Sequence, residues 1–506
     1  MPAQAEVRAQ AAKGKASPDN NDPQALAQHY LHVHGRTKGG TMMLHFWRSQ
    51  HWSWDGRRYY TIGSDDLRAR VRKCIQEEFE RVAEKEKKTP LKVTSSLVTN
   101  VVQALESITL IPEDWEQPVF LGPLAGKKKI DGFISMANGL VDLHALLERK
   151  SGNALPHTPD WFSGVSLPYG YDPSNECPQW RAFLSEVLEQ DDERIKLLQE
   201  IFGYCLLPNT SEQKFIVFEG EGANGKSVVC EILASMLGEE NVSHVPLEVF
   251  GERFQLTATI GKLANIAPEV GELKSVAEGY LKQFTSGERM YFDRKGLPPI
   301  HVRPTARLVL AANNRPRFSD RSAGLWRRLE LMPFRVTIPE EKQDRNLVQR
   351  LREELPGVFM WAVEGERRRR TQGGFTKAKV CLDALQDYRL EVNPARMYLT
   401  DHVEVVQDEV LMSSELYAAY KPWCDRNGYK PLPLQSFGKE VKRQFPGVER
   451  ERERSGERRW FYRGIRLRSV DGDPEPDGPG GPPGSPGPSS HCPIDMQRAE
   501  VLQTVH

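Results

Sequence analysis

The sequence lacks the features that mark secreted, zinc-stabilised and membrane-spanning proteins. Its seven cysteines are far apart and form no C-x-x-C pair, so neither a disulfide framework nor a zinc site is predicted. No run of about 18 apolar residues occurs, and the N-terminus carries no apolar signal segment. The sequence therefore predicts a soluble protein of a reducing, cytoplasmic compartment, with no membrane partner.

An excess of charge of either sign is also missing. The chain has 69 Lys and Arg and 69 Asp and Glu among its 506 residues. Any nucleic-acid surface must therefore be local rather than global. The clearest basic surface lies between positions 415 and 469, which contain 14 Lys or Arg and seven Asp or Glu.

The length suggests roughly three domains between two tails. Residues 1–25, rich in Ala, Gln, Lys and Asn, and residues 470–506, rich in Pro, Gly and Ser, have the composition of disordered segments. Between them we predict an α+β, mainly helical domain, an α/β core, a helical extension with a linker, and a small basic module. Their predicted bounds are 26–209, 210–340, 341–407 and 408–469.

Local patterns predict several elements outside the core. Aromatic pairs on either side of Asp55-Gly56 predict a β-hairpin; they either pack across the strands or stack on nucleic-acid bases. Asn138-Gly139 between two apolar runs predicts another hairpin. Asp191-Asp192, between two predicted helices, is more typical of a helix N-cap than of a metal site. The charge run Glu366–Arg370 is expected to be a solvated helix end or a phosphate contact.

The stretch Gly220–Ser227 matches the phosphate-loop pattern G-x-x-x-x-G-K-[ST] in full. An apolar run precedes it and a helix-compatible run follows, so its context is strand, glycine loop and helix. In such a loop, backbone N–H groups and the helix N-terminus surround a polyphosphate, the lysine reaches the β- and γ-phosphates, and the serine holds Mg²⁺. The predicted nucleotide-binding residues are Gly220, Glu221, Gly222, Ala223, Asn224, Gly225, Lys226, Ser227 and Val228.

Polar residues follow two further apolar strands of the predicted core. A short strand ends just before Glu269, with Glu272 close behind, and a second strand ends at Asn313. A carboxylate at the C-terminal end of a strand is where α/β folds place the acid that organises Mg²⁺ and polarises water. Between the two strands, a basic and aromatic stretch around Arg294-Lys295 predicts either a hairpin that grips DNA or an ordinary surface turn.

The order of these residues resembles superfamily 3 helicases of the phage, plasmid and poxvirus primase-helicase family. Lys226, Glu269, Asn313 and Arg327 lie 43, 44 and 14 residues apart, which is compact for a nucleotide hydrolase. The resemblance is strongest in the G-x-N-G-K-S form of the phosphate loop and extends, more weakly, over roughly positions 40–469. The other segments that carry it are 263–269, 281–288, 304–316 and 324–334.

The resemblance implies a fold and a set of residue roles. It implies an AAA+-like P-loop core of the α/β class, with a mainly helical collar domain before it and a winged-helix-like module after it. ATP and Mg²⁺ are the implied cofactors, with Mg²⁺ held by Ser227 and Glu269. Glu269 is the implied catalytic acid, Asn313 the γ-phosphate sensor and Arg327 a finger that acts on the neighbouring subunit's ATP.

The implied partners are DNA and further copies of the chain. Single-stranded DNA would occupy the channel of a ring, of six subunits as in the family, and double-stranded DNA would bind the winged helix. A separate primase or replisome protein is a further implied partner. The residues expected to contact DNA are Arg294, Lys295, Lys439, Lys442 and Arg443.

The sequence departs from the family pattern in three places. Pro268 replaces a small polar residue, and the two acids are three positions apart, so Glu272 remains an alternative to Glu269. Arg328 likewise competes with Arg327 as the finger. The first 130 residues contain no D-x-D on an apolar strand, so the two-metal site of a primase is predicted to be absent.

The sequence thus predicts an ATP-dependent replicative DNA helicase that unwinds DNA as a ring in phage, plasmid or mobile-element replication. Two alternatives remain open at this point. One is a DNA-binding ATPase switch, and the other is an origin-binding scaffold without unwinding activity.

Overall fold

The structure is a computed structural model. The chain forms two compact units, residues 1–393 and 394–506, which we describe separately. The described residues are 21–122, 132–150, 154–208, 210, 212–268, 275–316, 318, 323–453 and 458–468.

The first unit begins with three helices and a small antiparallel sheet. The predicted turn at Asp55-Gly56 joins two of the strands, with Trp54 opposite Tyr59. Trp47 packs edge-on against Trp52 of the neighbouring strand, which confirms cross-strand packing for this pair, and Trp47 and Tyr59 are buried against Phe162 from later in the chain. The elements are α2 (Pro23–Val33), β1 (Leu44–Trp47), β2 (Gln50–Trp54), β3 (Tyr59–Ile62), α3 (Ser64–Glu86) and α4 (Ser95–Ile108).

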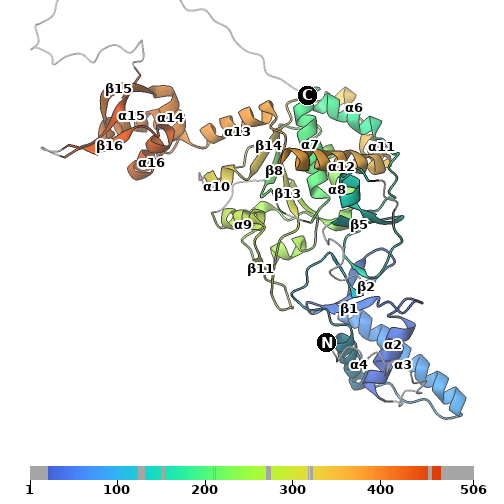
Figure 1. The fold of residues 1–506 in the computed structure, drawn as a ribbon. Coiled ribbons are helices and arrows are strands. Elements are labelled where there is room, and N and C mark those ends of the chain that lie inside the picture. Colours follow the sequence, from blue (N-terminus) through green and yellow to red (C-terminus); the bar gives the residue numbers. More distant parts are fainter. Residues whose placement is uncertain are drawn as a thin grey trace, which may run out of the picture. The chain divides into compact units, whose positions relative to one another are not determined.

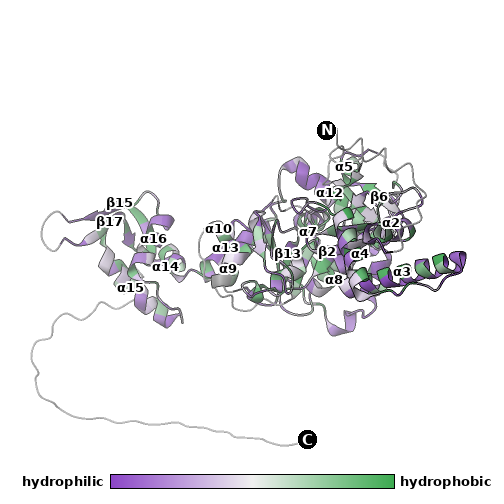
Figure 2. Cartoon of the chain, turned by 90° about the horizontal axis from the view of Figure 1, so that it is seen from below, coloured by the Kyte–Doolittle hydropathy of each residue, from purple (hydrophilic) through white to green (hydrophobic). Residues whose placement is uncertain are grey.

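The charged helix α3 is amphipathic. Its buried residues, among them Leu67, Val71, Ile75 and Phe79, recur every three or four positions and pack against α2 and α4. Hydrophilic and hydrophobic residues alternate along it in Figure 2. The burial of this one face holds α3 against the other two helices.

Between this sheet and the core, the described residues form two short sheets and three helices. Met136 pairs with Gly139, which confirms the hairpin at Asn138-Gly139. The Asp191 carboxylate accepts hydrogen bonds from the backbone N–H groups of Glu193 and Arg194, so it is a helix N-cap, as predicted. The elements are β4 (Val119–Phe120), β5 (Phe133–Met136), β6 (Gly139–Asp142), α5 (Leu143–Leu147), β7 (Trp161–Phe162), α6 (Pro178–Val187) and α7 (Asp192–Cys205).

A parallel sheet of five strands, in the order β14-β8-β13-β10-β9, forms the core of the first unit. This confirms the predicted α/β class. Besides these strands, the described part of this region contains the longer helices α8 and α9 and an antiparallel hairpin, β11–β12. The elements are β8 (Phe215–Glu219), α8 (Lys226–Leu237), β9 (Val242–Ser243), β10 (Ala264–Pro268), α9 (Ser275–Ser286), β11 (Met290–Phe292), β12 (Ile300–Val302), β13 (Arg307–Ala312), α10 (Ala323–Trp326) and β14 (Leu329–Pro333).

Both faces of this sheet are covered, which is why its strands are almost continuously apolar. Along β8, Ile216 and Phe218 face one hydrophobic cluster with α7, α8 and α12 (Leu355–Gln372), whereas Phe215 and Val217 face the other. That second cluster includes residues of α9, of β11–β12 and of α13 (Lys379–Glu391). Figure 1 shows the sheet between these layers.

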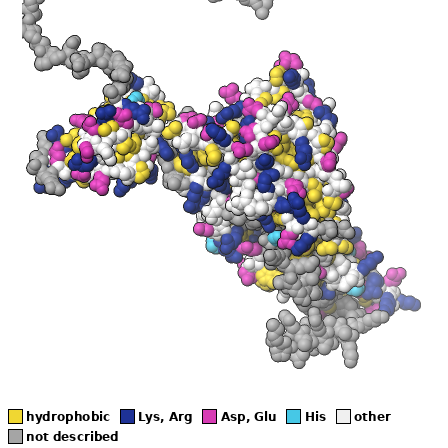
Figure 3. All heavy atoms as spheres, turned by 45° about the horizontal axis from the view of Figure 1, so that its top comes forward, with side chains coloured by type: hydrophobic (Ala, Val, Ile, Leu, Met, Phe, Trp, Pro, Cys, Tyr) yellow, Lys and Arg dark blue, Asp and Glu magenta, His cyan; other side chains and the backbone are white. Residues whose placement is uncertain are grey.

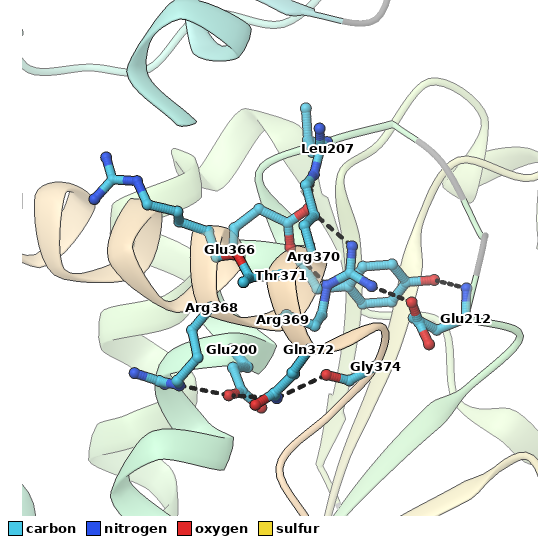
Figure 4. Close-up of polar contacts among 12 residues, drawn as sticks. Glu200, Leu207, Glu212, Glu366, Arg368, Arg369, Arg370, Thr371, Gln372 and Gly374 are labelled. Carbon is cyan, nitrogen blue, oxygen red and sulfur yellow. Dashed lines mark hydrogen bonds and ion pairs between the residues drawn. The ribbon is translucent and has the colours of Figure 1, made fainter. Parts of the chain in front are cut away.

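The charge run on α12 is a correction to the sequence prediction. Glu366 and Arg369 are buried rather than solvated, and Arg369 forms ion pairs with Glu366 and Glu212. Arg368 donates to the fully buried Glu200 of α7 (Figure 4). These charges are removed from solvent because α12 packs along α7, and side chains of one helix accept hydrogen bonds from the other. A short helix, α11 (Leu347–Glu353), precedes α12.

The second unit folds around its own core. Tyr420 stacks on Phe437 with ring centroids 4.4 Å apart, and Tyr398 packs beside Tyr420. Residues 394–407 belong to the stretch predicted as helical extension and linker, and Tyr398 and Leu399 of this stretch are buried in the core of the second unit. The strand order is β15-β17-β16. The elements are α14 (Pro394–His402), β15 (Val403–Met412), α15 (Ser413–Arg426), α16 (Leu434–Gln444), β16 (Glu449–Arg452) and β17 (Trp460–Leu467).

The surface mixes charges of both signs. On the face in Figure 3, Lys and Arg side chains alternate with Asp and Glu, as the balanced composition leads one to expect. Over the stretches that the structure describes, none of the helices combines the length and the apolar character of a membrane span.

Candidate functional site

The stretch with the phosphate-loop pattern connects β8 to α8 at the C-terminal edge of the parallel sheet. Gly220 and Gly225 have positive φ angles of 155° and 87°. A Cβ on Gly220 would lie 2.3 Å from the Phe334 carbonyl oxygen, and one on Gly225 would lie 2.9 Å from Val187 Cγ1. The glycines are therefore needed for the path of the backbone, as in a loop that turns its N–H groups inward.

Lys226 is the first residue of α8 and is folded back over this loop. Its ammonium group donates to the Gly220 carbonyl, to the Glu221 carbonyl at 3.1 Å and to Asn224 Oδ1 at 3.1 Å. The side chain is buried, and this burial lowers the pKa of Lys226. Its acceptors here are neutral oxygens, so a phosphate could compensate its charge better than the loop does. Ser227, next to it, is exposed.

Asn224 holds the loop in shape from within. It is buried, its amide nitrogen donates to the Glu221 carbonyl, and its Oδ1 accepts from the Lys226 backbone N–H at 3.3 Å. These contacts hold the loop at the N-terminus of α8, with the ammonium group of Lys226 turned toward it. The residues present thus fit a nucleoside polyphosphate.

A cavity of about 260 Å³ lies beside the start of the loop. Arg315 lines it and bridges two carboxylates, Glu219 at 2.7 Å and Glu391 at 2.8 Å, and these contacts raise its pKa against the opposing effect of burial. Arg335 lines the same cavity. Neither arginine is predicted from the sequence as a site residue. The position of Arg315, two residues after the predicted sensor Asn313, is the sequence feature that could have indicated it.

Asn313 lies at the same edge of the sheet as the loop. It directly follows β13, whose last residue, Ala312, accepts a hydrogen bond from the Gly220 N–H at 3.2 Å. The Asn313 side chain is exposed. The structure therefore places Asn313 next to the loop that contains Lys226.

Arg327 and Arg328 lie at the opposite edge. The Arg328 carbonyl accepts from the backbone N–H of Phe215, the first residue of β8. Arg327 is exposed, whereas the Arg328 guanidinium is half-buried and donates to the Gly324 carbonyl at 2.7 Å. Burial, with Arg327 nearby, lowers the pKa of Arg328. Of the two, Arg327 is the one presented to solvent.

The predicted acids, Glu269 and Glu272, lie outside the described residues. The strand β10 runs to Pro268, which pairs with Ala311 of β13. Among the residues that the structure describes, no group of three His, Cys, Asp or Glu side chains could hold a metal ion.

The predicted DNA-contacting residues fall into two groups. In the connection between β11 and β12, Lys295 is exposed, but Arg294 is buried and donates to the Pro298 and Arg48 carbonyls. The Arg294 guanidinium is therefore engaged within the subunit rather than offered to a phosphate. On α16 of the second unit all three side chains are exposed: Lys439, Lys442 and Arg443.

Three protein-family models match separate parts of the chain. Residues 24–189 match "D5 N terminal like", residues 218–328 match a "Family of unknown function (DUF5906)", and residues 393–469 match the "RFX DNA-binding domain". The third match coincides with the second structural unit and its basic surface.

The chain is also similar to viral proteins described as putative helicases. It is 25% identical over 263 residues to "Putative helicase L207/L206" of Acanthamoeba polyphaga mimivirus, covering 48% of this chain and 25% of that protein. It is 23% identical over 323 residues to "Putative helicase 184R" of Invertebrate iridescent virus 6, covering 54% and 32%. The chain thus spans about a quarter to a third of the length of these relatives.

One solved structure to which the chain is similar is "The A form apo structure of NrS-1 C terminal region-CTR". The identity is 13% and the TM-score 0.49, with 88% of this chain and 99% of that chain covered.

Proposed function

Because this chain is related to the viral primase-helicase-like proteins, we propose that it is an ATP-dependent DNA helicase that acts as a ring of identical subunits. The observation that carries the proposal is the division of the predicted residues between two edges of one sheet. The loop Gly220–Ser227 and Asn313 lie at the C-terminal edge, and Arg327 lies at the N-terminal edge. Strand β8 separates them by five residues, or about 15 Å.

This separation supports a shared site. Arg327 cannot reach the loop of its own subunit along the strand, yet it is exposed and available to a neighbouring subunit. In the proposed ring, each subunit supplies the loop of one site and the finger of the next, so hydrolysis depends on assembly.

Within the proposed site, each residue has a role that its surroundings allow. ATP with Mg²⁺, when bound, supplies the phosphoanhydride bond whose cleavage drives movement. Lys226 would exchange its loop carbonyls for phosphate oxygens, Ser227 and Glu269 would hold the metal, and Glu269 would polarise the attacking water. Asn313 would contact the γ-phosphate. Glu272 and Arg328 are the alternatives for the acid and the finger.

We further propose that the second unit is a winged-helix-like module that binds double-stranded DNA. The order helix, strand, two helices and two strands, the exposed cations of α16 and the match to the RFX DNA-binding domain support this assignment. In the same proposal the chain supplies helicase activity, and a separate protein supplies primers.

A strand-displacement assay on forked DNA tests the helicase proposal. We expect the wild-type chain to separate the strands only with ATP and Mg²⁺, and Lys226→Ala to lose both ATP turnover and separation by at least about 100-fold. Glu231→Ala is a matched control, because this partly exposed residue lies on α8 beyond the loop. ATP turnover and DNA binding without separation would instead favour the ATPase switch, and DNA binding without turnover would favour the scaffold.

A further inference from the structure

Arg315 connects the start of the proposed ATP site to the end of α13. Its Nε donates to Glu219 Oε1 at 2.7 Å, and Glu219 is the last residue of β8, directly before the loop Gly220–Ser227. Its Nη1 donates to Glu391 Oε2 at 2.8 Å, and Glu391 is the last residue of α13. One guanidinium is thus shared between a carboxylate next to the loop and a carboxylate at the end of a helix.

The two ion pairs of Arg315 differ in strength. The Glu219 side chain is 17% exposed, whereas that of Glu391 is 55% exposed and lies at the C-terminal end of a helix, where a further negative charge is unfavourable. An ion pair with an exposed partner contributes little stability because water screens it. The pair of Arg315 with Glu391 is therefore the one that breaks first when the charge around Arg315 changes.

A nucleotide in the loop would change this charge. Glu219 and Arg315 both line the cavity beside the loop, and Glu219 Oε2 is buried without a hydrogen-bond partner among the described residues. Burial lowers the pKa of Lys226, and the nearby Cys230 and Glu219 oppose this shift, so the Glu219 charge reaches the loop lysine. Phosphates held by Lys226 would add negative charge beside Glu219 and attract the Arg315 guanidinium. Arg315 would then move toward the loop and away from Glu391.

The same end of α13 also packs against the residue in front of the proposed finger. Tyr388, one turn before Glu391, is fully buried, and its hydroxyl donates to the Pro316 carbonyl. Its ring lies edge-on to Trp326, with the centroids 5.2 Å apart, and Trp326 directly precedes Arg327. Because buried side chains are closely packed, a shift of the last turn of α13 would be passed on to Trp326.

We propose that Arg315 couples the nucleotide in a subunit's own loop to the finger that the same subunit offers to its neighbour. In the arrangement seen here, Arg315 holds the end of α13 through Glu391. When ATP occupies the loop, Arg315 turns toward it, the last turn of α13 is released, and Trp326 shifts together with Arg327. The coupling rests on the proposed function, because it requires ATP in the loop and Arg327 as the finger. Arg315 is thus a positioning residue, since it acts on the neighbouring site only through other side chains.

Nucleotide affinity provides the first test, measured with the full chain, Mg²⁺ and a fluorescent, non-hydrolysable ATP analogue. The wild-type chain must break the pair of Arg315 with Glu391 on binding, whereas Glu391→Gln has no such pair to break. We therefore expect Glu391→Gln to bind the analogue about two- to five-fold more tightly. Asp383→Asn is the matched control, because Asp383 is 56% exposed, lies on the same helix and pairs with Lys379, so its affinity should equal that of the wild type. Equal or weaker affinity of Glu391→Gln would overturn the proposal.

The fluorescence of Trp326 provides the second test, because a mere loss of charge near the loop would tighten binding without moving Trp326. Its signal is the difference between a chain and the same chain with Trp326→Phe, since the sequence has ten tryptophans. In the wild type this difference should change when an unlabelled analogue saturates the loop, and in Glu391→Gln it should have the nucleotide-bound value throughout. The same response in both chains, or none in the wild type, would show that Arg315 does not act on Trp326. The affinity test decides alone if Trp326→Phe does not fold.

The two measurements also distinguish failure of the coupling from failure of the helicase proposal. If Trp326 responds through Glu391 but the wild type separates no strands, the coupling stands without the helicase activity. If the wild type separates strands and Glu391→Gln has the affinity and the response of the wild type, the helicase activity stands and the coupling is wrong. If the wild type binds no nucleotide, both are wrong.

Discussion

At the scale of single residues, burial determines which side chains can change their charge. His45 on β1 packs near the rings of Tyr59 and Phe162, and its Nε2 is buried without a hydrogen-bond partner among the described residues. Burial lowers the pKa of His45 to about 4, although a hydrogen bond from the imidazole to the Thr109 backbone opposes the shift. The imidazole is therefore neutral in the folded protein at pH 7.

This depressed pKa predicts a loss of stability in mild acid. The unfolded chain protonates His45 near pH 6.5, whereas the folded chain does so near pH 4, so its contribution is full above pH 6.5 and is lost as pH falls toward 4. Between pH 7 and pH 5 we expect about 2 kcal/mol less unfolding free energy from this residue. Denaturant titrations at the two pH values measure it.

The informative comparison is the pH dependence, since His45→Gln also changes stability by an amount that does not vary with pH. His45→Gln should lose less free energy than the wild type between pH 7 and pH 5, and the exposed His32→Gln should behave like the wild type. Equal pH dependence in all three chains would show that His45 is protonated in the folded state.

At the scale of elements, the pairing of α7 with α12 depends on a buried carboxylate. Glu200 is fully buried and accepts hydrogen bonds from Arg368 Nε at 2.6 Å, from Gln372 Nε2 at 3.0 Å and from the backbone and hydroxyl of Thr376, each at 2.6 Å. Several donors thus converge on one side chain (Figure 4). Loss of its charge leaves the Arg368 guanidinium with only neutral acceptors, Gln199 Oε1 and the Lys196 carbonyl.

We predict that Glu200→Gln lowers the unfolding free energy of the first unit by about 3 kcal/mol. The amide of glutamine would point hydrogen-bond donors at other donors. Glu364→Gln is the matched control on α12, because Glu364 is half-exposed and pairs with Arg367, so its loss should be below about 1 kcal/mol. Thermal or denaturant unfolding measures both, and equal losses would contradict a special role for the buried carboxylate.

An element could be predicted from the sequence when the residues that determine it lie close together along the chain. The strand, loop and helix around Gly220–Ser227 follow from residues within about 20 positions, and the structure has them where the sequence places them. The hairpin at Asn138-Gly139 and the cap at Asp191 are local in the same sense. Such features need no knowledge of the rest of the chain.

Features that depend on distant partners could not be predicted. Arg315 is positioned by Glu219 and Glu391, which lie 96 and 76 residues away. Arg294 is buried because the Arg48 carbonyl, 246 residues earlier, accepts its hydrogen bond. A charged residue that pairs across such a separation has the same sequence pattern as a solvated one. For this reason the sequence predicts a solvated helix end or a phosphate contact at Glu366–Arg370, where the structure buries Glu366 and Arg369.

At the scale of the whole molecule, the parallel sheet separates the proposed site of ATP binding from the arginine proposed to act on the neighbouring subunit. The proposed ATP site lies at one edge, while Arg327 lies at the other. A change of nucleotide in one subunit would therefore reach DNA contacts through the sheet or through the neighbouring subunit's Arg327. The second route requires that the subunits complement one another.

Mixing two inactive variants tests this complementarity. Lys226→Ala removes the loop function and keeps the finger, and Arg327→Ala removes the finger and keeps the loop. If the finger acts between subunits, an equal mixture restores complete sites where the two variants meet in the right order, about a quarter of all sites. ATP turnover of the mixture should then reach about a quarter of the wild-type rate, provided that sites act independently.

A finger that acts within its own subunit predicts the opposite result, because every subunit of the mixture then carries a broken site. Arg328→Ala mixed with Lys226→Ala provides the matched comparison. The Arg328 guanidinium is half-buried and donates to the Gly324 carbonyl, so its removal should leave the exposed Arg327 to act, and the Arg328→Ala chain alone should retain turnover. If Arg328→Ala is instead inactive alone and only its mixture with Lys226→Ala recovers turnover, the role transfers to Arg328, and no recovery in a mixture of two inactive variants would argue against a shared site.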